Sequence, residues 1–267
     1  MLREDGWNSV SLTAAYWQLA GVLAGFAFVA LASYLITGPG GSVATRSRAD
    51  RSGAARSLFS TFAALVLVAV LYALLTGEPD GSPRANLGVL VTGVPFGLAI
   101  ITMFYSLTQM AAARGLYDLA RTGRFLVVFI GPVVVFSRLN NGVFVVSRGT
   151  SSPWPPYRTG WVLLVLVAVL SFICAALGRR FPRWRFGETI SAHACLVTGV
   201  LAAGIAAYLA AKPASYNLSE GALHATVALM AVVMVGFSVA AASAISAELS
   251  RARSAVTSGQ MHLFDVA

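Results

Sequence analysis

Charged residues are scarce in this sequence. Only 11% of the 267 residues are charged, whereas 57% are hydrophobic. A soluble domain has about a quarter charged residues and about half apolar ones, so this chain cannot cover a folded surface with polar groups. No polar block is long enough to fold as a separate soluble domain. The composition therefore predicts a single domain for which lipid is the main solvent.

Cysteine, histidine and lysine are also rare, and each scarcity argues against a class of site. Cys174 and Cys195 both lie in apolar runs, so no disulfide framework is expected. No Cys/His spacing resembles a zinc site, and no glycine-rich phosphate loop is present. His193 and His224 are expected near opposite membrane faces, which argues against a shared haem. The last apolar run has no lysine for a retinal Schiff base, so no cofactor or metal is expected.

Seven apolar runs are candidates for membrane-spanning helices. They are expected at about 14–37, 58–75, 87–110, 119–137, 161–177, 189–211 and 222–247. The predicted fold class is therefore all-α, a polytopic seven-helix membrane domain over 14–247. It is flanked by an N-terminal segment, 1–13, and a tail, 248–267. The N-terminal segment lacks the basic region of a cleavable signal, so the first span is expected to remain.

The fourth run is the shortest, because only 125–136 is uninterrupted. Its length alone would also suit a re-entrant segment. An Asn-Gly pair at 141–142 lies in the middle of 133–146, which is rich in valine on both sides and has the local pattern of a β-hairpin. An open hairpin leaves backbone groups unpaired in lipid. We therefore predict a helix from about Leu119 and place any hairpin outside the membrane.

The basic residues predict the orientation of the chain. With seven crossings, 13 of the 19 basic residues fall in the tail and in the loops after spans one, three and five. The positive-inside rule then puts the N-terminus outside and the C-terminus in the cytoplasm. The same rule explains the net charge of +9 without a nucleic-acid partner. Nearly all basic residues are arginine, which hints at a GC-rich bacterial genome and hence at the bacterial plasma membrane.

The stretch 87–124 is the one around which we expect the other helices to pack. Pro95 lies between two glycines in its apolar part, a pattern typical of a broken helix that lines a cavity. Thr102, Tyr105 and Gln109 follow at i, i+3 and i+7, so they share one helical face. A charged loop is expected after them. The stretch therefore predicts a polar face in the cytoplasmic half of the bundle.

Two polar clusters are candidate sites. The first faces the cytoplasm and is predicted to bind a substrate through Tyr105, Gln109, Asp118, Glu188 and His193. The second lies outside, where Glu78 ends the second span and Glu220 opens the seventh, and paired carboxyls are a possible catalytic acid and base. Tyr16 and Arg138 are expected at the level of this second cluster. Each cluster also has a structural alternative: salt bridges and helix contacts for the first, and a helix-dipole role for Glu220.

Three function classes remain open. We favour a bundle that transports or binds a small molecule or lipid, because of the expected break and polar face in 87–124. The second class is a membrane-embedded enzyme. Seven spans with acidic residues at their ends are similar in plan to membrane terpene cyclases, in which acidic residues donate protons. The similarity is limited to span count and acid placement, without a sequence motif, so membership of that family is not inferred.

The third class is a structural subunit that binds another membrane protein. Small residues at helical spacing let helices approach closely. The support for this class is Gly199, Ala203 and Ala207 in the sixth span and the small residues 240–246 in the seventh. Gly21 and Gly25 have the same kind of spacing in the first span, which predicts a packed helix and not a dimer. The expected partners are thus the lipid bilayer, an apolar small molecule and, in this third class, another membrane protein.

Overall fold

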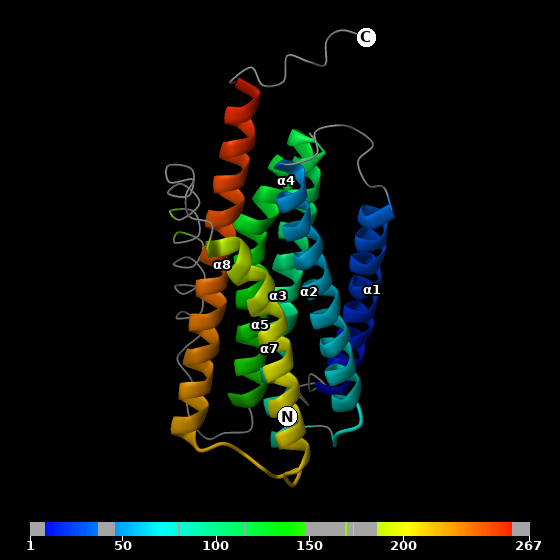
Figure 1. The fold of residues 1–267 in the computed structure, drawn as a ribbon. Coiled ribbons are helices and arrows are strands. Elements are labelled where there is room, and N and C mark those ends of the chain that lie inside the picture. Colours follow the sequence, from blue (N-terminus) through cyan, green and yellow to red (C-terminus); the bar gives the residue numbers. More distant parts are fainter. Residues whose placement is uncertain are drawn as a thin grey trace, which may run out of the picture.

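The computed structural model describes residues 9–36, 46–79, 81–114, 116–147, 169, 173 and 186–257. Their regular secondary structure is helical, and no strand occurs among them. The helices are α1 (Ser9–Ile36), α2 (Arg46–Leu75), α3 (Pro83–Ala113), α4 (Tyr117–Phe125), the π-helical η1 (Leu126–Ile130), α5 (Gly131–Ser147), α7 (Phe186–Ala210) and α8 (Glu220–Thr257). The long helices stand side by side as a bundle (Figure 1).

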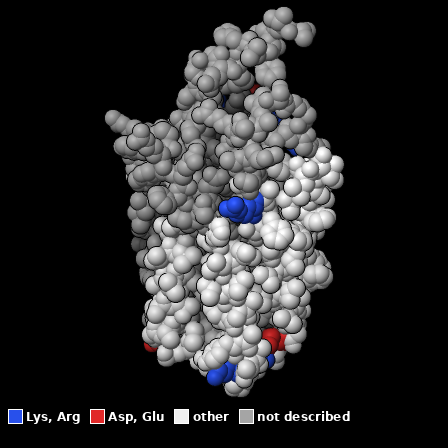
Figure 2. Space-filling model, in the orientation of Figure 1, with Lys and Arg blue, Asp and Glu red and all other residues white. Residues whose placement is uncertain are grey.

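Six described helical stretches are long and apolar enough to cross a membrane. They are Thr13–Ile36, Gly53–Leu75, Pro83–Ala112, Asp118–Asn141, His193–Ala210 and Glu220–Ile245. The predicted fifth span, 161–177, lies outside the described residues except for Val169 and Ile173, which are helical and exposed. In Figure 2 a broad band of the described surface carries no charge above the acidic and basic side chains of the lower end. The chain is thus an all-helical bundle compatible with an integral membrane protein.

Helix α3 forms the centre of the bundle, and nearly every residue of its span is buried. The Oγ of Ser82 accepts a hydrogen bond from the Ala85 amide at 3.2 Å, and Pro83 follows in the first turn, as is common where helices begin. The expectation of a break at Pro95 is wrong, because α3 continues through it. A proline removes one backbone hydrogen bond, and a helix packed on all sides tolerates that loss. The prediction that the chain packs around this helix is confirmed.

The fourth crossing is helical throughout. Helices α4, η1 and α5 follow one another without a gap from Tyr117 to Ser147, so the hairpin pattern around 141–142 is not realised. In lipid every backbone polar group needs a partner, which a helix supplies within itself, and this requirement overrides the turn preference of Asn-Gly. The expected charged loop is also shorter than predicted. Helix α3 ends at Ala113, and most of the charged stretch after it belongs to α4.

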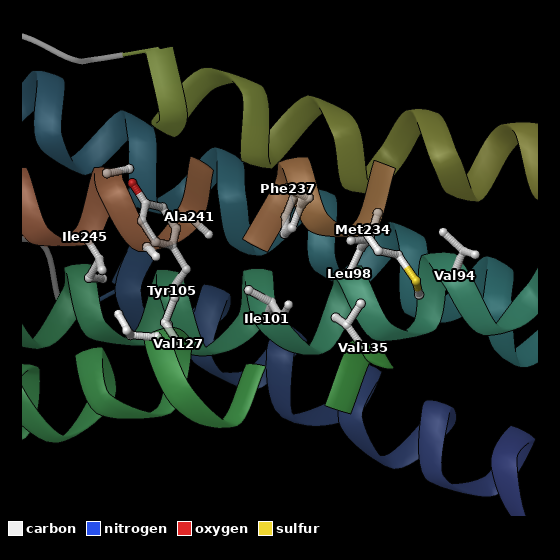
Figure 3. Close-up of a cluster of buried hydrophobic side chains, with 13 residues drawn as sticks. Val94, Leu98, Ile101, Tyr105, Val127, Val135, Met234, Phe237, Ala241 and Ile245 are labelled. Atoms are coloured by element: carbon white, nitrogen blue, oxygen red, sulfur yellow. The ribbon is translucent and has the colours of Figure 1, made fainter. Parts of the chain in front are cut away.

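A large apolar cluster joins α3 to the η1–α5 segment and to α8 (Figure 3). Leu98 of α3 lies among Val135 of α5 and Met234 and Phe237 of α8, all of them buried. A Cβ atom at Gly97 would lie 3.4 Å from the Met234 side chain and 3.5 Å from the Val135 backbone. The glycine therefore allows two neighbouring helices to pack closely against α3.

Helix α1 lies at the edge of the bundle and packs mainly against α2. Most of its span is exposed. Cβ atoms built at Gly21 and Gly25 would meet nothing within 4 Å, so these two glycines make no close helix contact in the described part of the chain. Gly199 of α7 behaves as expected, because a Cβ there would lie 3.7 Å from the backbone of Ala64 in α2.

Candidate functional site

Tyr105 and Gln109 of the predicted substrate site are both buried on α3. The Gln109 Nε2 donates a hydrogen bond of 2.9 Å to the Tyr105 hydroxyl, one helical turn away. The nearby hydroxyls bond to their own helix as well: Thr102 donates to the carbonyl of Leu98 at 2.8 Å, and Ser106 donates to that of Thr102 at 2.7 Å. The polar face of α3 is therefore largely satisfied within the helix itself.

The other predicted members of this site lie towards the beginnings of helices. Asp118 is in the first turn of α4, and its side chain is exposed. His193 is the first residue of the apolar stretch of α7 and is also exposed. Glu188 lies in the first turn of α7, and its side chain is outside the described part of the structure. Asp118 and His193 are thus surface residues, in contrast to the buried Tyr105–Gln109 pair.

Glu78 is bound to Arg84 where the chain turns from α2 into α3. The Nε and Nη2 of Arg84 donate hydrogen bonds of 2.9 and 2.5 Å to one oxygen, Oε2, of the Glu78 carboxylate. Its Nη1 donates to the backbone carbonyls of Ala210 and Lys212, at the end of α7. Carbonyls at a helix C-terminus have no partner within the helix, so the guanidinium supplies one. A single arginine therefore ties together the end of α2, the start of α3 and the end of α7.

Glu220 opens α8, at the same end of the bundle as the turn between α2 and α3 (Figure 1). Its side chain is exposed, and its backbone oxygen lies 2.7 Å from the Nδ1 of His224. A carboxylate in a first turn is stabilised by the helix dipole. The catalytic pairing of Glu78 with Glu220 stays a prediction. The ion pair of Glu78 with Arg84 favours a structural role for that carboxylate.

Three aromatic rings from three helices meet where α1 begins and α2 ends. They are Tyr16 of α1, Tyr72 of α2 and Phe96 of α3. The ring centres are 5.4 Å apart for Tyr16 and Tyr72, 6.1 Å for Tyr16 and Phe96, and 6.0 Å for Tyr72 and Phe96, which pack edge to face. Tyr72 and Phe96 are completely buried. Such contacts are within the range at which aromatic pairs stabilise a core.

Helix α5 adds a guanidinium to these rings. The Cζ of Arg138 lies 4.1 Å from the centre of the Tyr16 ring and 4.9 Å from that of Phe96, within the range of cation–π attraction. A Cβ atom at Gly93 of α3 would lie 3.7 Å from the Arg138 carbonyl oxygen, so the two helices pass close to each other here. The Nε and Nη1 of Arg138 are buried and donate no hydrogen bond within the described chain. We call Tyr16, Tyr72, Phe96 and Arg138 the aromatic box.

The aromatic box places a positive charge within an apolar stretch, about one helical turn from its end. Arg138 lies three residues before Asn141, the last residue of the fourth described span. A charged side chain at the centre of a spanning helix costs about 2.5–3.5 kcal/mol on insertion scales, and a desolvated cation–π contact contributes about 2 kcal/mol. Two ring contacts thus offset much of the cost. They do not supply acceptors for the N–H groups, which lie in the plane of the guanidinium.

A second cation, Lys212, lies between two rings at the turn that follows α7. Its Nζ is 4.7 Å from the centre of the Tyr208 ring and 5.6 Å from that of Tyr216, and the two rings pack edge to face. The hydrogen bond with Tyr208 raises the pKa of Tyr216 above its ordinary value. Tyr208 is exposed at the end of a spanning helix and Tyr216 is half-buried in the turn that follows, and tyrosines at such helix ends are typical of the membrane–water interface. This trio therefore marks a surface level, in contrast to the buried rings around Arg138.

The sequence predicted one aspect of the aromatic box, namely that Tyr16 and Arg138 share a level. It did not predict that the arginine stacks on rings, because Glu78 and Glu220 were the expected centre of that cluster. Arg138 interrupts an apolar run, which is a signal for a functional intramembrane charge. Tyr72 and Phe96 carry no such signal, since aromatic residues in spanning helices are common.

The helices, their lengths and the uncharged belt define the class of this protein as a helical bundle of integral-membrane type. No protein-family model, curated protein or solved structure matches the chain. The function is therefore inferred from the site alone.

Proposed function

We propose that this protein is a seven-span bundle of the bacterial plasma membrane that binds a small amphipathic molecule or lipid at the aromatic box. The observation that carries the proposal is Arg138, a half-buried cation whose Nε and Nη1 atoms are buried and donate no hydrogen bond within the described residues. Ionisable groups inside a membrane are costly and usually functional. The Tyr16 and Phe96 rings beside the guanidinium suit a ligand with a polar end and a hydrocarbon body.

The position of α1 supports binding from the bilayer. This helix contributes the Tyr16 ring to the aromatic box, yet most of its span is exposed. Its principal contact is with α2, whereas Arg138 belongs to α5. The contact of Arg138 with the Tyr16 ring is thus a side-chain link between α1 and α5. A small displacement of an edge helix is enough to admit a lipid-sized molecule between them.

A ligand that occupies the aromatic box is expected to co-purify when the protein is extracted with its surrounding lipid into polymer-bounded discs. Mass spectrometry of these discs should find about one enriched small molecule or lipid per chain. Replacement of Tyr16 by leucine keeps an apolar side chain but removes the ring, so occupancy should fall at least tenfold. The matched control is Phe26→Leu, which removes a ring from a side chain that is 65% exposed on the same helix. Equal lipid content in wild type and Tyr16→Leu would refute the proposal.

The proposed topology has the N-terminus outside, the C-terminus in the cytoplasm and a seventh crossing at 161–177. It is supported by the six described spans and by the distribution of basic residues. Cysteines introduced at Gly77 and Arg183, in a chain free of native cysteines, test it with a membrane-impermeant maleimide. Gly77→Cys should be labelled in intact cells, and Arg183→Cys only after permeabilisation. Labelling of Arg183→Cys from outside would mean that the number of crossings before it is wrong.

A further inference from the structure

Arg138 has no acidic partner in the described part of the chain. Glu78, the acidic residue at the turn between α2 and α3, is held by Arg84. Asp118 belongs to α4, at the opposite end of the same continuous helical segment, and is 20 residues away. Within the described residues the cation–π contacts of the guanidinium are with the rings of Tyr16 and Phe96. Ring contacts compensate charge, but they leave the hydrogen-bonding capacity of the group unused.

The stacking also fixes how the guanidinium is presented. Rings attract a cation over their faces, so Tyr16 and Phe96 hold the guanidinium against their π-systems. Its N–H bonds all lie in one plane and point outward from the edges. Nε and Nη1, the two buried nitrogens, belong to different edges of the planar group. Each of these edges is completed by Nη2, so either edge can offer an anion the two parallel hydrogen bonds that arginine forms with a carboxylate or a phosphate.

We infer that the ligand of the aromatic box is an oxyanion, a carboxylate or a phosphate, bound by the edge N–H groups of Arg138. This inference rests on the proposed binding function and adds the chemical class of the ligand. A half-buried cation without an acidic partner among the described residues is stabilised by an anion, and the low local dielectric strengthens that attraction. The oxyanion belongs either to an amphiphile in the bilayer or to a free inorganic ion, and the two sources give different results in one experiment.

The experiment uses the full chain in micelles of a maltoside detergent, which carries no oxyanion, titrated with oleate, with oleyl alcohol and with inorganic phosphate. Oleate and oleyl alcohol have the same hydrocarbon tail and differ in the charge of the head. The shift of the thermal unfolding midpoint with concentration gives each dissociation constant. We expect oleate to bind the wild type at least tenfold more tightly than oleyl alcohol. Phosphate that competes with oleate would identify a free ion as a second source, whereas phosphate without effect would restrict the site to amphiphiles.

Three variants connect the preference for oleate to the guanidinium. Arg138→Gln should abolish the difference between oleate and oleyl alcohol. Arg138→Lys keeps the charge without the planar fork, so an intermediate preference is expected. Arg121→Gln is the matched control, because it removes one exposed positive charge from α4 in the same continuous helical segment. It should keep the full preference, which separates a bound anion from general attraction to a basic protein.

Two results would overturn the inference. One is equal affinity of the wild type for oleate and oleyl alcohol, and the other is a preference for oleate that survives in Arg138→Gln. Equal affinities that both fall in Tyr16→Leu would refute the oxyanion and leave the proposed binding function intact. Absence of binding by either ligand, together with a co-purified ligand that does not depend on Tyr16, would refute both. If Arg138→Gln does not fold, the comparison in the wild type and in Arg138→Lys still decides.

Discussion

Replacement of Gly123 by alanine is expected to lower the free energy of unfolding by about 2 kcal/mol, the usual scale for overpacking a well-filled contact. A Cβ atom at this position of α4 would overlap the Oγ1 of Thr108 in α3, and it would lie 3.1 Å from the Thr108 Cβ and 3.3 Å from its Cγ2. The threonine side chain cannot turn away freely, because its Oγ1 donates a hydrogen bond of 2.6 Å to the Phe104 carbonyl. The measurement is unfolding in mixed micelles, followed by tryptophan fluorescence.

Two controls make this prediction specific to the contact between α3 and α4. Alanine is a better helix former than glycine by about 1 kcal/mol. Gly21→Ala, where the new atom meets nothing within 4 Å, should therefore be neutral or stabilising. The double variant Gly123→Ala with Thr108→Ala removes the overlapping atoms and should recover most of the loss, which makes the two changes non-additive. A Gly123→Ala protein as stable as the wild type would show that α4 does not pack this closely against α3.

Gly123 also illustrates which part of the fold the sequence could predict. Hydropathy located each of the six described spans, because a run of about 20 apolar residues has few alternatives to a membrane helix. The polar side chains of α3 identified it as the central helix, because hydroxyl and amide groups such as those of Thr102 and Gln109 need partners away from lipid. Hydropathy did not show that α4 begins as soon as Tyr117 and packs on α3. That contact depends on a single missing side chain rather than on a run of residues.

The aromatic box could not be assembled from the sequence for a related reason. Its four residues come from four helices, so they meet only if each helix has the right rotation about its axis. In soluble helices an apolar stripe gives that rotation, but helices that are apolar on most faces lack a clear stripe. Tyr16 and Arg138 could be placed at one level by counting residues from the span ends. Whether Tyr72 and Phe96 face these two residues depends on how the helices pack, which the sequence alone does not determine.

Arg84→Gln is expected to destabilise the protein by about 2–3 kcal/mol, less than the 3–5 kcal/mol typical when one partner of a fully buried ion pair is removed. The expected loss of stability is smaller because this ion pair is partly exposed: the side chains of Arg84 and Glu78 are 19% and 17% accessible. Arg84 bonds to the carboxylate and also to the carbonyls of Ala210 and Lys212. Its loss should therefore cost more than that of the Glu78 carboxylate, whose hydrogen bonds within the described residues come from Arg84.

The same set of variants tests whether Glu78 is a structural ion-pair partner of Arg84, which we call a clamp, or a catalytic acid. If it is a clamp, Glu78→Gln lowers stability by about 1–2 kcal/mol, and the double variant with Arg84→Gln costs less than the sum of the single changes. Glu220→Gln, at the exposed start of α8, should then cost at most about 1 kcal/mol from the helix dipole. If Glu78 and Glu220 act as an acid–base pair, both single changes abolish turnover equally and neither needs to change stability. Glu78→Gln therefore loses stability under the first hypothesis and keeps it under the second, so the unfolding of these four variants separates the two hypotheses before a substrate class is fixed.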